Sequence, residues 1–567
     1  MCTKVNNSLI LGVLLIRSEN RERKYFMQSI GSERVYNTSD TRYVLAIDLG
    51  SGGHKVAIIA DSGQVIASAD EKITTYLLPG GGAEQDPEEW WIGAKNAARK
   101  VIRQANIPAR NIVAVACDSQ WSVVVPVDEH GEPLMRAVHW LDHRGGPYNR
   151  KIAAGFPSIQ GYGLMKLLKW IKLTGFAPTH SGADSLGHVL FIKNERPDIY
   201  AKTYKFLEPM DYLISRLTGK IVATQKTMAP FMIVDNRHWG SCEYSDALLN
   251  LAGVEKEKFP LLLPNDGIVG SLQPSVAEEL GLHPSTRVIA GISDSNASLI
   301  GSGAVQDYES IIYIGTSQYL TCHLPFKKTD IASFMASIPS PFKSRYYLFG
   351  EQLTGGQCME FYLNNLIYFQ DELETGPRPE DSYERVDTIV SQTPAGSGGV
   401  IFLPWLNGSG APQENTNARG GFFNLSLKTT RNHLTRAVLE GLAFNNRWTK
   451  EAAEKFIGRP IERLRFSGGG ALSGVFSQIH ADVLKVPIHQ VDDPINTTVR
   501  GAALLALVIL GYRSLEELPD LVGIQKVFEP DESKRQIYDP MYTQYRQLFK
   551  KNKKVFAALN DRPRHSV

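Results

Sequence analysis

The sequence has few cysteines, and they are too scattered to support a disulfide framework. Five occur in 567 residues, and no two are separated by only two positions. Compact zinc sites and redox-active pairs use such close spacings, so neither is predicted. An odd, dispersed set of thiols is typical of a reducing compartment, and we expect a cytoplasmic protein. The five are Cys2, Cys117, Cys242, Cys322 and Cys358.

An excess of charge of either sign is also missing. Lys and Arg total 61 against 59 for Asp and Glu, which gives a formal net charge of +2. Because the chain has no basic block, it lacks a positive electrostatic field that would attract a phosphodiester backbone. Nucleic acid is therefore not expected as a partner. The content of 43% hydrophobic and 21% charged residues is typical of a globular protein. Because single cores stop growing near about 250–300 residues, the length predicts two large domains.

The apolar run near the N-terminus is too short to cross a bilayer. Leu9–Ile16 falls far below the roughly 20 residues that a span needs, so no membrane partner is expected. Arg17 and further basic residues follow it directly, without a small-residue cleavage site. We expect residues 1–40 to be a poorly ordered extension. A signal peptide and a later start at Met27 are the alternatives.

Two distant segments share a strand–turn–strand pattern. Residues 43–60 form two apolar runs around the glycine-rich turn Gly50–Gly53, and Asp48 closes the first run. Residues 310–323 repeat this pattern around Gly315–Ser317. The repetition predicts an internal duplication whose halves meet near residue 290. Helical spacing recurs between the strands, which favours α/β layers. The predicted helices are Pro87–Gln104, Arg431–Phe456 and Thr498–Gly511.

Several common catalytic motifs are absent. The chain has no GxxxxGK[ST], HExxH or GxSxG sequence and no GxGxxG that opens a helix. It has instead four glycine-rich turns, whose free N–H groups can hold phosphate oxygens. A single turn of this kind is usually an ordinary hairpin, but four of them favour a nucleotide. The turns are Gly50–Gly53, Gly315–Ser317, Gly396–Gly399 and Gly468–Gly470.

Two aspartates follow predicted strands at positions suited to chemistry. Asp48 can hold a magnesium ion through water, or it can bond the backbone of its own turn. Asp294 follows the apolar run Val288–Ile292, at the strand end where α/β proteins collect ligands. It is a candidate general base, and its alternative role is to cap the next helix. Lys55 either contacts phosphate or is simply exposed.

Two aromatic segments suggest a site for a polyol. In one, Trp121 can stack on a sugar ring while Gln120 and Ser122 bond hydroxyl groups. A buried core tryptophan is the alternative. The second segment, His139–Arg144, predicts either part of the same pocket or a packed loop with an ion pair.

These motifs together resemble the FGGY family of carbohydrate kinases over residues 43–545. The Asp48–Ser51 turn is similar to the family's first phosphate motif, and Lys55 lies where its lysine does. Trp140–Arg144 resembles the W-x-D-x-R stretch of the family's sugar site. Gly291–Gly303 resembles the segment whose aspartate is the catalytic base in the family, which implies that role for Asp294. Gly420–Phe422 with Arg431–Glu440 is similar to the C-terminal signature.

The resemblance implies two duplicated actin-like, RNase H-like α/β domains around a deep cleft. The sugar-binding domain would span residues 41–290 and the ATP-binding domain residues 291–548, followed by a tail at 549–567. Asp48 would hold the metal. The implied sugar-site residues are Gln120, Trp121, Ser122, Trp140, Asp142, Arg144, Asp294 and Ser295. The implied nucleotide-site residues are Gly50, Ser51, Gly52, Lys55, Gly315, Thr316, Ser317, Gly398, Gly399, Gly468, Gly469, Gly470 and Ala471.

Two departures from the family pattern concern the sugar and a loop. Xylulose kinases usually have Gln-Met-His where this chain has Gln120–Ser122. Gly408–Pro412 stands where many members have G-E-R-x-P, so two charges are missing.

The sequence therefore predicts an ATP-dependent sugar kinase that uses ATP and Mg²⁺. The best guess for the acceptor is a ketopentose such as xylulose, and the resemblance implies a homodimer. A non-catalytic sugar-sensing pseudokinase of the same fold is one alternative. An ATPase like actin or Hsp70 is the other.

Overall fold

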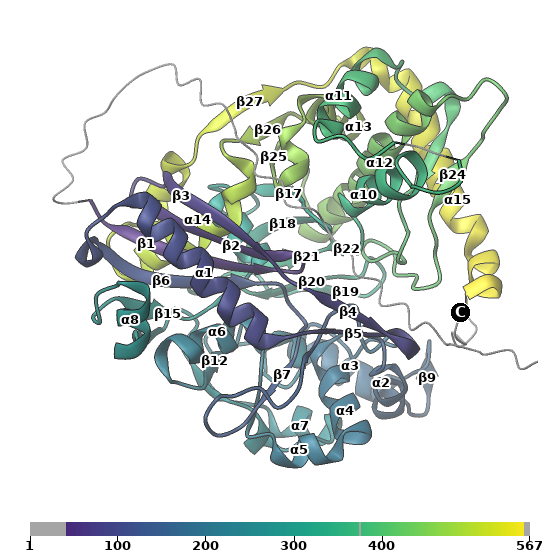
Figure 1. The fold of residues 1–567 in the computed structure, drawn as a ribbon. Helices are drawn as coiled ribbons and strands as arrows, with labels where there is room; N and C mark the ends of the chain where they lie inside the picture. The colour runs from purple at the N-terminus through teal and green to yellow at the C-terminus, as the bar shows by residue number, and fades with distance from the viewer. Residues whose placement is uncertain (1–40, 374–375, 561–567) are drawn as a thin grey trace, which may run out of the picture.

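The computed structural model describes residues 41–373 and 376–560 (Figure 1). The predicted extension at residues 1–40 lies outside this range. No helix in the described part of the chain has the length and apolar character needed to traverse a lipid bilayer.

The first sheet has seven strands and contains the N-terminal hairpin. Its order is β14-β15-β6-β1-β2-β3, and β16 also pairs with β6. Alternate side chains of β1 enter two separate cores, one on each face, because the sheet is covered on both sides. The strands are β1 (Tyr43–Gly50), β2 (Gly53–Ala60), β3 (Val65–Lys72), β6 (Ile112–Ser119), β14 (Ile268–Ser271), β15 (Arg287–Ile289) and β16 (Ile292–Ser293).

The second sheet has nine strands in the order β19-β20-β21-β18-β17-β25-β26-β27, and β22 also pairs with β18. Its bounds are β17 (Ser310–Ile314), β18 (Gln318–Leu324), β19 (Thr329–Asp330), β20 (Met335–Pro339), β21 (Tyr346–Phe349), β22 (Glu351–Gln352), β25 (Leu464–Ser467), β26 (Ile488–Val491) and β27 (Ile524–Phe528).

The two sheets repeat one topology, as the sequence predicts. Each begins with an antiparallel hairpin, β1–β2 or β17–β18. The first strand of each hairpin then pairs in parallel with a later strand, β6 or β25. The next strand continues the parallel order, and an antiparallel strand closes the edge in both sheets. The internal duplication is therefore confirmed.

Fifteen α-helices occur in the described residues. The predicted helices at 87–104, 431–456 and 498–511 correspond to α1, α12 and α14, and Gly458 ends α12 in the left-handed conformation. The helices are α1 (Pro87–Ala105), α2 (Gly146–Ala153), α3 (Leu164–Thr174), α4 (Ser185–Glu195), α5 (Pro197–Lys202), α6 (Pro209–Thr218), α7 (Asp246–Ala252), α8 (Pro274–Leu280), α9 (Asp294–Gly301), α10 (Gln357–Tyr362), α11 (Ser382–Gln392), α12 (Arg431–Ile457), α13 (Gly474–Leu484), α14 (Thr497–Ile509) and α15 (Arg535–Asn560).

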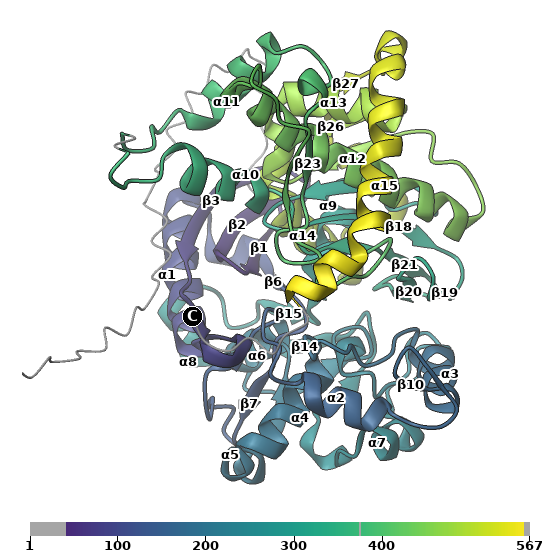
Figure 2. The ribbon, with the colours of Figure 1, turned by 90° about the vertical axis from the view of Figure 1, so that its right-hand side faces the viewer.

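A helical body lies beneath the first sheet in both ribbon views (Figures 1 and 2). It contains α2–α5 and α7 and has its own core, which includes Trp170, Phe206 and Phe231. Short strands connect it to the sheet: β4 (Thr75–Leu78), β5 (Gly82–Gln85), β7 (Val125–Val127), β8 (Ala137–Val138), β9 (Ser158–Ile159), β10 (Tyr162–Gly163), β11 (Lys205–Leu207), β12 (Val222–Thr224) and β13 (Leu261–Leu263). In the other domain β23 (Ile401–Leu403) pairs with β24 (Gly421–Phe423).

Two predicted boundaries differ from the structure. The division between residues 290 and 291 falls inside the first sheet, because β16 still pairs with β6. The predicted tail from residue 549 is helical as far as Asn560, since the aromatic side of α15 is buried. Phe549 packs edge-on against Trp405, with ring centroids 4.7 Å apart, and Asn560 donates a hydrogen bond to the carbonyl oxygen of Asn417.

The two halves meet at a close crossing of α9 and α14. A Cβ atom at Gly301 would lie 1.8 Å from the carbonyl oxygen of Thr497, and one at Gly501 would lie 1.7 Å from that of Ala297. Only glycine allows this backbone approach. Arg500 fixes the crossing further, because its Nε donates to the carbonyl oxygen of Gly301 at 2.8 Å. The crossing holds the ends of both sheets around one space.

We expect Gly501→Ala to destabilise the fold. Its Cβ has no room at the crossing, so the helices must separate, and overpacking of this kind costs about 1–3 kcal/mol. Gly421→Ala is the matched control, because a Cβ there has no neighbour within 4 Å. Denaturant unfolding measures both variants. Equal midpoints for the two would show that the crossing tolerates a side chain.

Candidate active site

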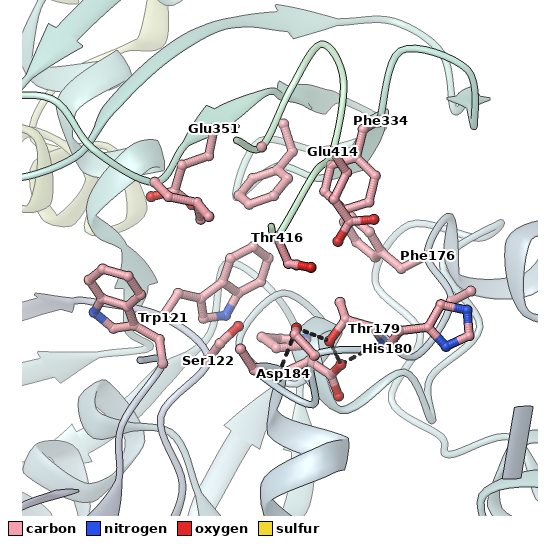
Figure 3. Close-up of a pocket in the computed structure, with 18 of the residues that line it drawn as sticks. Trp121, Ser122, Phe176, Thr179, His180, Asp184, Phe334, Glu351, Glu414 and Thr416 are labelled. Carbon is pink, nitrogen blue, oxygen red and sulfur yellow. Dashed lines mark hydrogen bonds between the residues drawn. The ribbon is translucent and has the colours of Figure 1, made fainter. Parts of the chain in front are cut away.

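A cavity of about 1860 Å³ lies between the two sheets. The ends of β1 and β6, the start of α9 and the β17–β18 turn all reach it. Figure 3 shows the part that faces the helical body, with Trp121 and Ser122 on one side and Glu351, Glu414 and Phe334 on the other. Both halves of the chain therefore contribute to one site.

Asp48 lies at the floor of this space, and Asp118 lies beside it, fully buried beneath the cavity lining. They are register partners on the parallel strands β1 and β6. Asp48 Oδ2 accepts a hydrogen bond from the Thr498 hydroxyl of α14 at 2.7 Å. Its Oδ1 and both oxygens of Asp118 are buried and have no donor among the described residues, except that the two carboxyl groups can share a proton with each other. Burial raises the pKa of both carboxyl groups, and the nearby charges of Asp48 and Asp294 raise that of Asp118 further.

The acidic floor fits a small divalent cation. Unpartnered carboxylate oxygens are the ligands that Mg²⁺ prefers, and this ion keeps several of its waters. No cluster of three or more His, Cys, Asp or Glu side chains in the described residues forms a complete metal cage. A cation held by Asp48 would therefore complete its shell with water or with ligand oxygens. That Asp48 holds a magnesium ion therefore stays a prediction, and the position of its carboxylate suits this role.

Asp294 is the first residue of α9 but does not cap it. Ser293 is the N-cap, and its hydroxyl accepts from the N–H of Asn296. The Asp294 carboxylate lines the cavity and accepts only the N–H of Ser295, at 2.7 Å. Burial, then the charges of Glu351 and Asp48, raise the pKa of Asp294. The capping alternative is thereby removed, and an accessible basic oxygen remains.

Glu351 is an acidic residue of the site that the sequence analysis missed. It begins β22, which pairs with β18, and it reaches the cavity from the second half (Figure 3). Burial raises its pKa to about 7. No local motif marks Glu351, because only the pairing of β22 with β18 brings it opposite Asp294.

The two matched glycine turns both reach the cavity. Gly50 and Ser51 line it from the first half, and the Trp140 indole N–H donates to the Ser51 hydroxyl at 2.9 Å. Thr316 and Ser317 line it from the second half. Gly52 is outside the lining, and Lys55 forms an ion pair with Asp70 at 2.9 Å. The structure thus brings together the turns but directs the Lys55 ammonium to a neighbouring strand.

The other two glycine turns lie farther out. Gly468–Ala471 adjoins the β17–β18 turn, since a Cβ at Gly468 would lie 2.5 Å from the carbonyl oxygen of Ile314, but it does not line the cavity. Gly398 and Gly399 pack near His433 and Asn424 instead. The Gly396 N–H and the Ser397 hydroxyl bind buried Glu440. The Gly396–Gly399 turn therefore makes its contacts within its own domain.

The predicted sugar residues separate into lining and supporting groups. Trp121 and Ser122 line the cavity, and the Trp121 ring meets Phe349 edge-on at 5.6 Å. Its indole N–H is buried without a partner. Gln120 is held between Gln85 and His139 by side-chain hydrogen bonds of 2.7 and 2.9 Å. Ser295 also lines the cavity, beside Asp294.

Asp142 is fully buried and supports the site rather than lining it. Its carboxylate accepts from the Ala83 N–H at 2.8 Å and from two nitrogens of the Arg144 guanidinium. Arg144 also donates to Glu84 at 2.7 Å. Both oxygens of Asp142 are occupied, so it holds Arg144 in place at the cavity wall.

The outer part of the cavity is aromatic and acidic. Phe176 and Phe334 approach it from opposite halves (Figure 3). Glu414 faces Asp184 across the space, and enclosure together with that charge raises the pKa of Glu414 to about 7. Asp184 itself accepts from the N–H and hydroxyl of Thr179 at 2.7 and 2.6 Å. The lining arginines are already engaged, Arg144 with carboxylates and Arg150 and Arg419 with backbone carbonyls.

The structure explains one of the two charges missing from the Gly408–Pro412 loop, the one at Gly410. A Cβ at Gly410 would lie 2.3 Å from the carbonyl oxygen of Glu351. The N–H of Ala411 donates to that same oxygen at 2.9 Å. The loop therefore packs directly on β22, where a long charged side chain has no room.

Comparison with known proteins gives matches to both halves of the chain. Two family models match, described as the N-terminal and C-terminal domains of the FGGY family of carbohydrate kinases, over residues 43–301 and 311–510. The chain is 26% identical to a xylulose kinase of Bacillus subtilis, covering 91% of this chain and 99% of that protein. It is 25% identical to a gluconokinase of the same organism, covering 85% and 91%. A crystal structure of gluconate kinase from Lactobacillus acidophilus shares the fold, with a TM-score of 0.78, 22% identity and coverage of 92% and 100%.

We expect Asp142→Ala to destabilise the protein. The change leaves the Ala83 N–H unpaired and removes a buried partner of Arg144, and breaking a buried ion pair typically costs about 3–5 kcal/mol. Asp235→Ala is a matched control, because Asp235 binds Arg237 in the same Asp-x-Arg arrangement at the surface. That loss should cost at most about 1 kcal/mol. Similar unfolding free energies for the two variants would contradict the supporting role of Asp142.

Proposed function

The chain belongs to the FGGY family of carbohydrate kinases, and we propose that it transfers the γ-phosphate of ATP to a hydroxyl group of a small neutral sugar. The observation that carries this proposal is Asp294. Its carboxylate accepts one backbone N–H and lines the same cavity as the paired glycine turns and Trp121. This is where a base must meet both substrates.

Asp48 would hold Mg²⁺, with Asp118 beside it, and the turns at Gly50–Ser51 and Thr316–Ser317 would bind phosphate oxygens. When bound, the cation offsets negative charge on the phosphates. Backbone N–H groups at the turns add fixed donors that need no reorganisation during the reaction. The Thr498 hydroxyl keeps Asp48 oriented toward the cavity.

Catalysis then depends on position and on one proton transfer. The sugar hydroxyl attacks the γ-phosphorus as Asp294 accepts its proton, and the bond from the γ-phosphorus to the bridging oxygen breaks. Trp121 supplies a flat apolar wall for the sugar, and Asp142 fixes Arg144 at another part of the cavity lining. Closure of the cleft would exclude water, which limits hydrolysis of ATP.

The charges of the cavity favour a neutral acceptor over an aldonic acid. Asp294, Glu351 and Glu414 line it, while the lining arginines are engaged by acids or carbonyl groups. A substrate carboxylate near Asp294 would therefore meet like charge, and the lining cation Arg144 is already paired with Asp142 and Glu84. A ketopentose such as xylulose is the first choice. A homodimer in the cytoplasm remains the expectation for the protein.

A substrate screen tests this function against its two alternatives. Purified protein is mixed with ATP, Mg²⁺ and single members of a panel of pentuloses, hexuloses, polyols and aldonic acids. ADP release and the mass of the sugar product are measured. Sugar-dependent ADP release with a phosphorylated neutral sugar is expected. Absence of any turnover favours a sugar-sensing pseudokinase, and ADP release without sugar favours an ATPase like actin or Hsp70.

We expect Asp294→Asn to lower the phosphorylation rate by about 10²–10⁴-fold, the usual loss for a general base. Folding should be nearly unchanged, because Ser293 caps the helix. Asp246→Asn is the matched control, since Asp246 follows Ser245 at the first position of α7, away from the cavity. A rate for Asp294→Asn close to that of the control would show that Asp294 is not the base.

We expect Glu351→Gln to move the acid limb of the kcat/KM profile to lower pH. Glu351 is a like charge that helps burial to raise the pKa of Asp294. Without that charge Asp294 loses its proton at lower pH, and the ionised form is the active one. Glu414→Gln is the control, because its carboxyl group is coupled to Asp184 instead. An unmoved limb, or a shift to higher pH, would contradict this electrostatic coupling.

A further inference from the structure

Tyr313 lines the cavity from the second half and has no assigned role so far. It is the fourth residue of β17, two positions before the Gly315–Ser317 turn. Its neighbours Ile312 and Ile314 point into the second-half core, whereas Tyr313 is half-buried and lines the cavity. The alternation of the strand therefore presents this side chain to the cleft.

The Tyr313 ring is clamped between the two glycine turns of the second half. A Cβ at Gly315 would lie 2.7 Å from the ring, and one at Gly468 would lie 3.1 Å from its other edge. The ring also stacks on Tyr319 with centroids 4.9 Å apart and planes at 8°. Both turns thus need glycine partly because this ring passes between them. A ring held on three sides has little freedom to move.

The Tyr313 hydroxyl has no hydrogen-bond partner in the described part of the chain. It lies in the combined field of Asp48, Asp294 and Asp118, whose charges add to burial in raising the pKa of the phenol. The hydroxyl therefore keeps its proton at neutral pH and is a hydrogen-bond donor surrounded by acidic groups. Tyr319 differs, because its hydroxyl is bound to the Ser298 hydroxyl at 2.8 Å.

We propose that Tyr313 is a catalytic residue whose hydroxyl donates a hydrogen bond to a non-bridging oxygen of the phosphoryl group in transfer. This inference rests on the proposed kinase function. The transferring group must pass between the base, Asp294, and the floor at Asp48. Tyr313 lines the same cavity, and the charges of both aspartates act on its phenol. Its position beside Gly315 puts it at the same turn that would bind the phosphates.

The phenol neither gains nor loses a covalent bond in this role. The sugar oxygen forms a bond to the γ-phosphorus, the bond to the bridging oxygen breaks, and ADP leaves with that electron pair. The sugar proton goes to Asp294. Tyr313 keeps its own proton and stabilises charge on the equatorial oxygens, an interaction that strengthens in the transition state.

The test compares Tyr313→Phe with Tyr319→Phe, which removes a hydroxyl from the other ring of the same stack. Three quantities are measured for both variants and the wild type. They are kcat with the sugar that the screen identifies, the Kd of ATP without sugar, and the Kd of ADP with Mg²⁺ and aluminium fluoride as a transition-state analogue. Circular dichroism confirms that each variant is folded.

For Tyr313→Phe we expect kcat to fall by about 10²–10³-fold, as when one oxyanion donor is removed. Affinity for the aluminium fluoride complex should fall in parallel, while the Kd of ATP stays unchanged. Tyr319→Phe should change kcat by only a few-fold. An unchanged kcat for Tyr313→Phe would overturn the proposal and leave the ring as packing.

A faster Tyr313→Phe variant that binds ATP more tightly would also overturn it, and would show that the hydroxyl obstructs the phosphates. Failure of the kinase function itself has a different signature, because the wild type then phosphorylates no sugar. In that case the aluminium fluoride measurement still decides whether the Tyr313 hydroxyl binds the transferring group. If wild type and Tyr313→Phe bind ADP with aluminium fluoride equally tightly, the proposed hydrogen bond is rejected.

Discussion

The crossing of α9 with α14 is the constraint on which the site depends. α9 carries Asp294 at its first position, and α14 carries Thr498, which binds Asp48. Because the two backbones touch at Gly301 and Gly501, neither helix can shift without moving the other. The crossing therefore sets the separation of the floor at Asp48 from the proposed base, Asp294. It also packs α14 against β1 and β6, which carry the two floor carboxylates.

This arrangement concentrates acidic groups where few protein cations reach. Burial raises the pKa of all four carboxyl groups, Asp48, Asp118, Asp294 and Glu351. The charges of Asp48 and Asp294 raise the pKa of Asp118 further, and those of Glu351 and Asp48 raise that of Asp294. An empty site of this kind is destabilising for the fold, since buried charges need partners. A bound cation, together with the N–H groups of the glycine turns, would supply that compensation. The same residues that weaken the free protein are thus suited to hold a nucleotide.

Local patterns predicted the features that depend on neighbouring residues in the chain. The β1–β2 and β17–β18 hairpins, the helix α12 and the acid at the end of β1 all follow from apolar runs and glycine turns. Asp142 was predicted to bond sugar, but tertiary contacts with Ala83 and Arg144 occupy it. Glu351 and Tyr313 had no local signal, because strand pairing and side-chain alternation alone place them at the cavity. The end of α15 was missed because its aromatic partner Trp405 is distant in sequence.

The crossing is also reciprocal, as in a two-fold dimer. Gly301 meets Thr497, four residues before Gly501, and Gly501 meets Ala297, four residues before Gly301. In a symmetric homodimer one codon specifies both sides of such a contact. In this chain the two sides are separate positions, 200 residues apart, that mutate independently. The two halves have diverged around these positions in loops and insertions. At the crossing, however, each half must keep a glycine because the backbone of the other half leaves no room for a side chain.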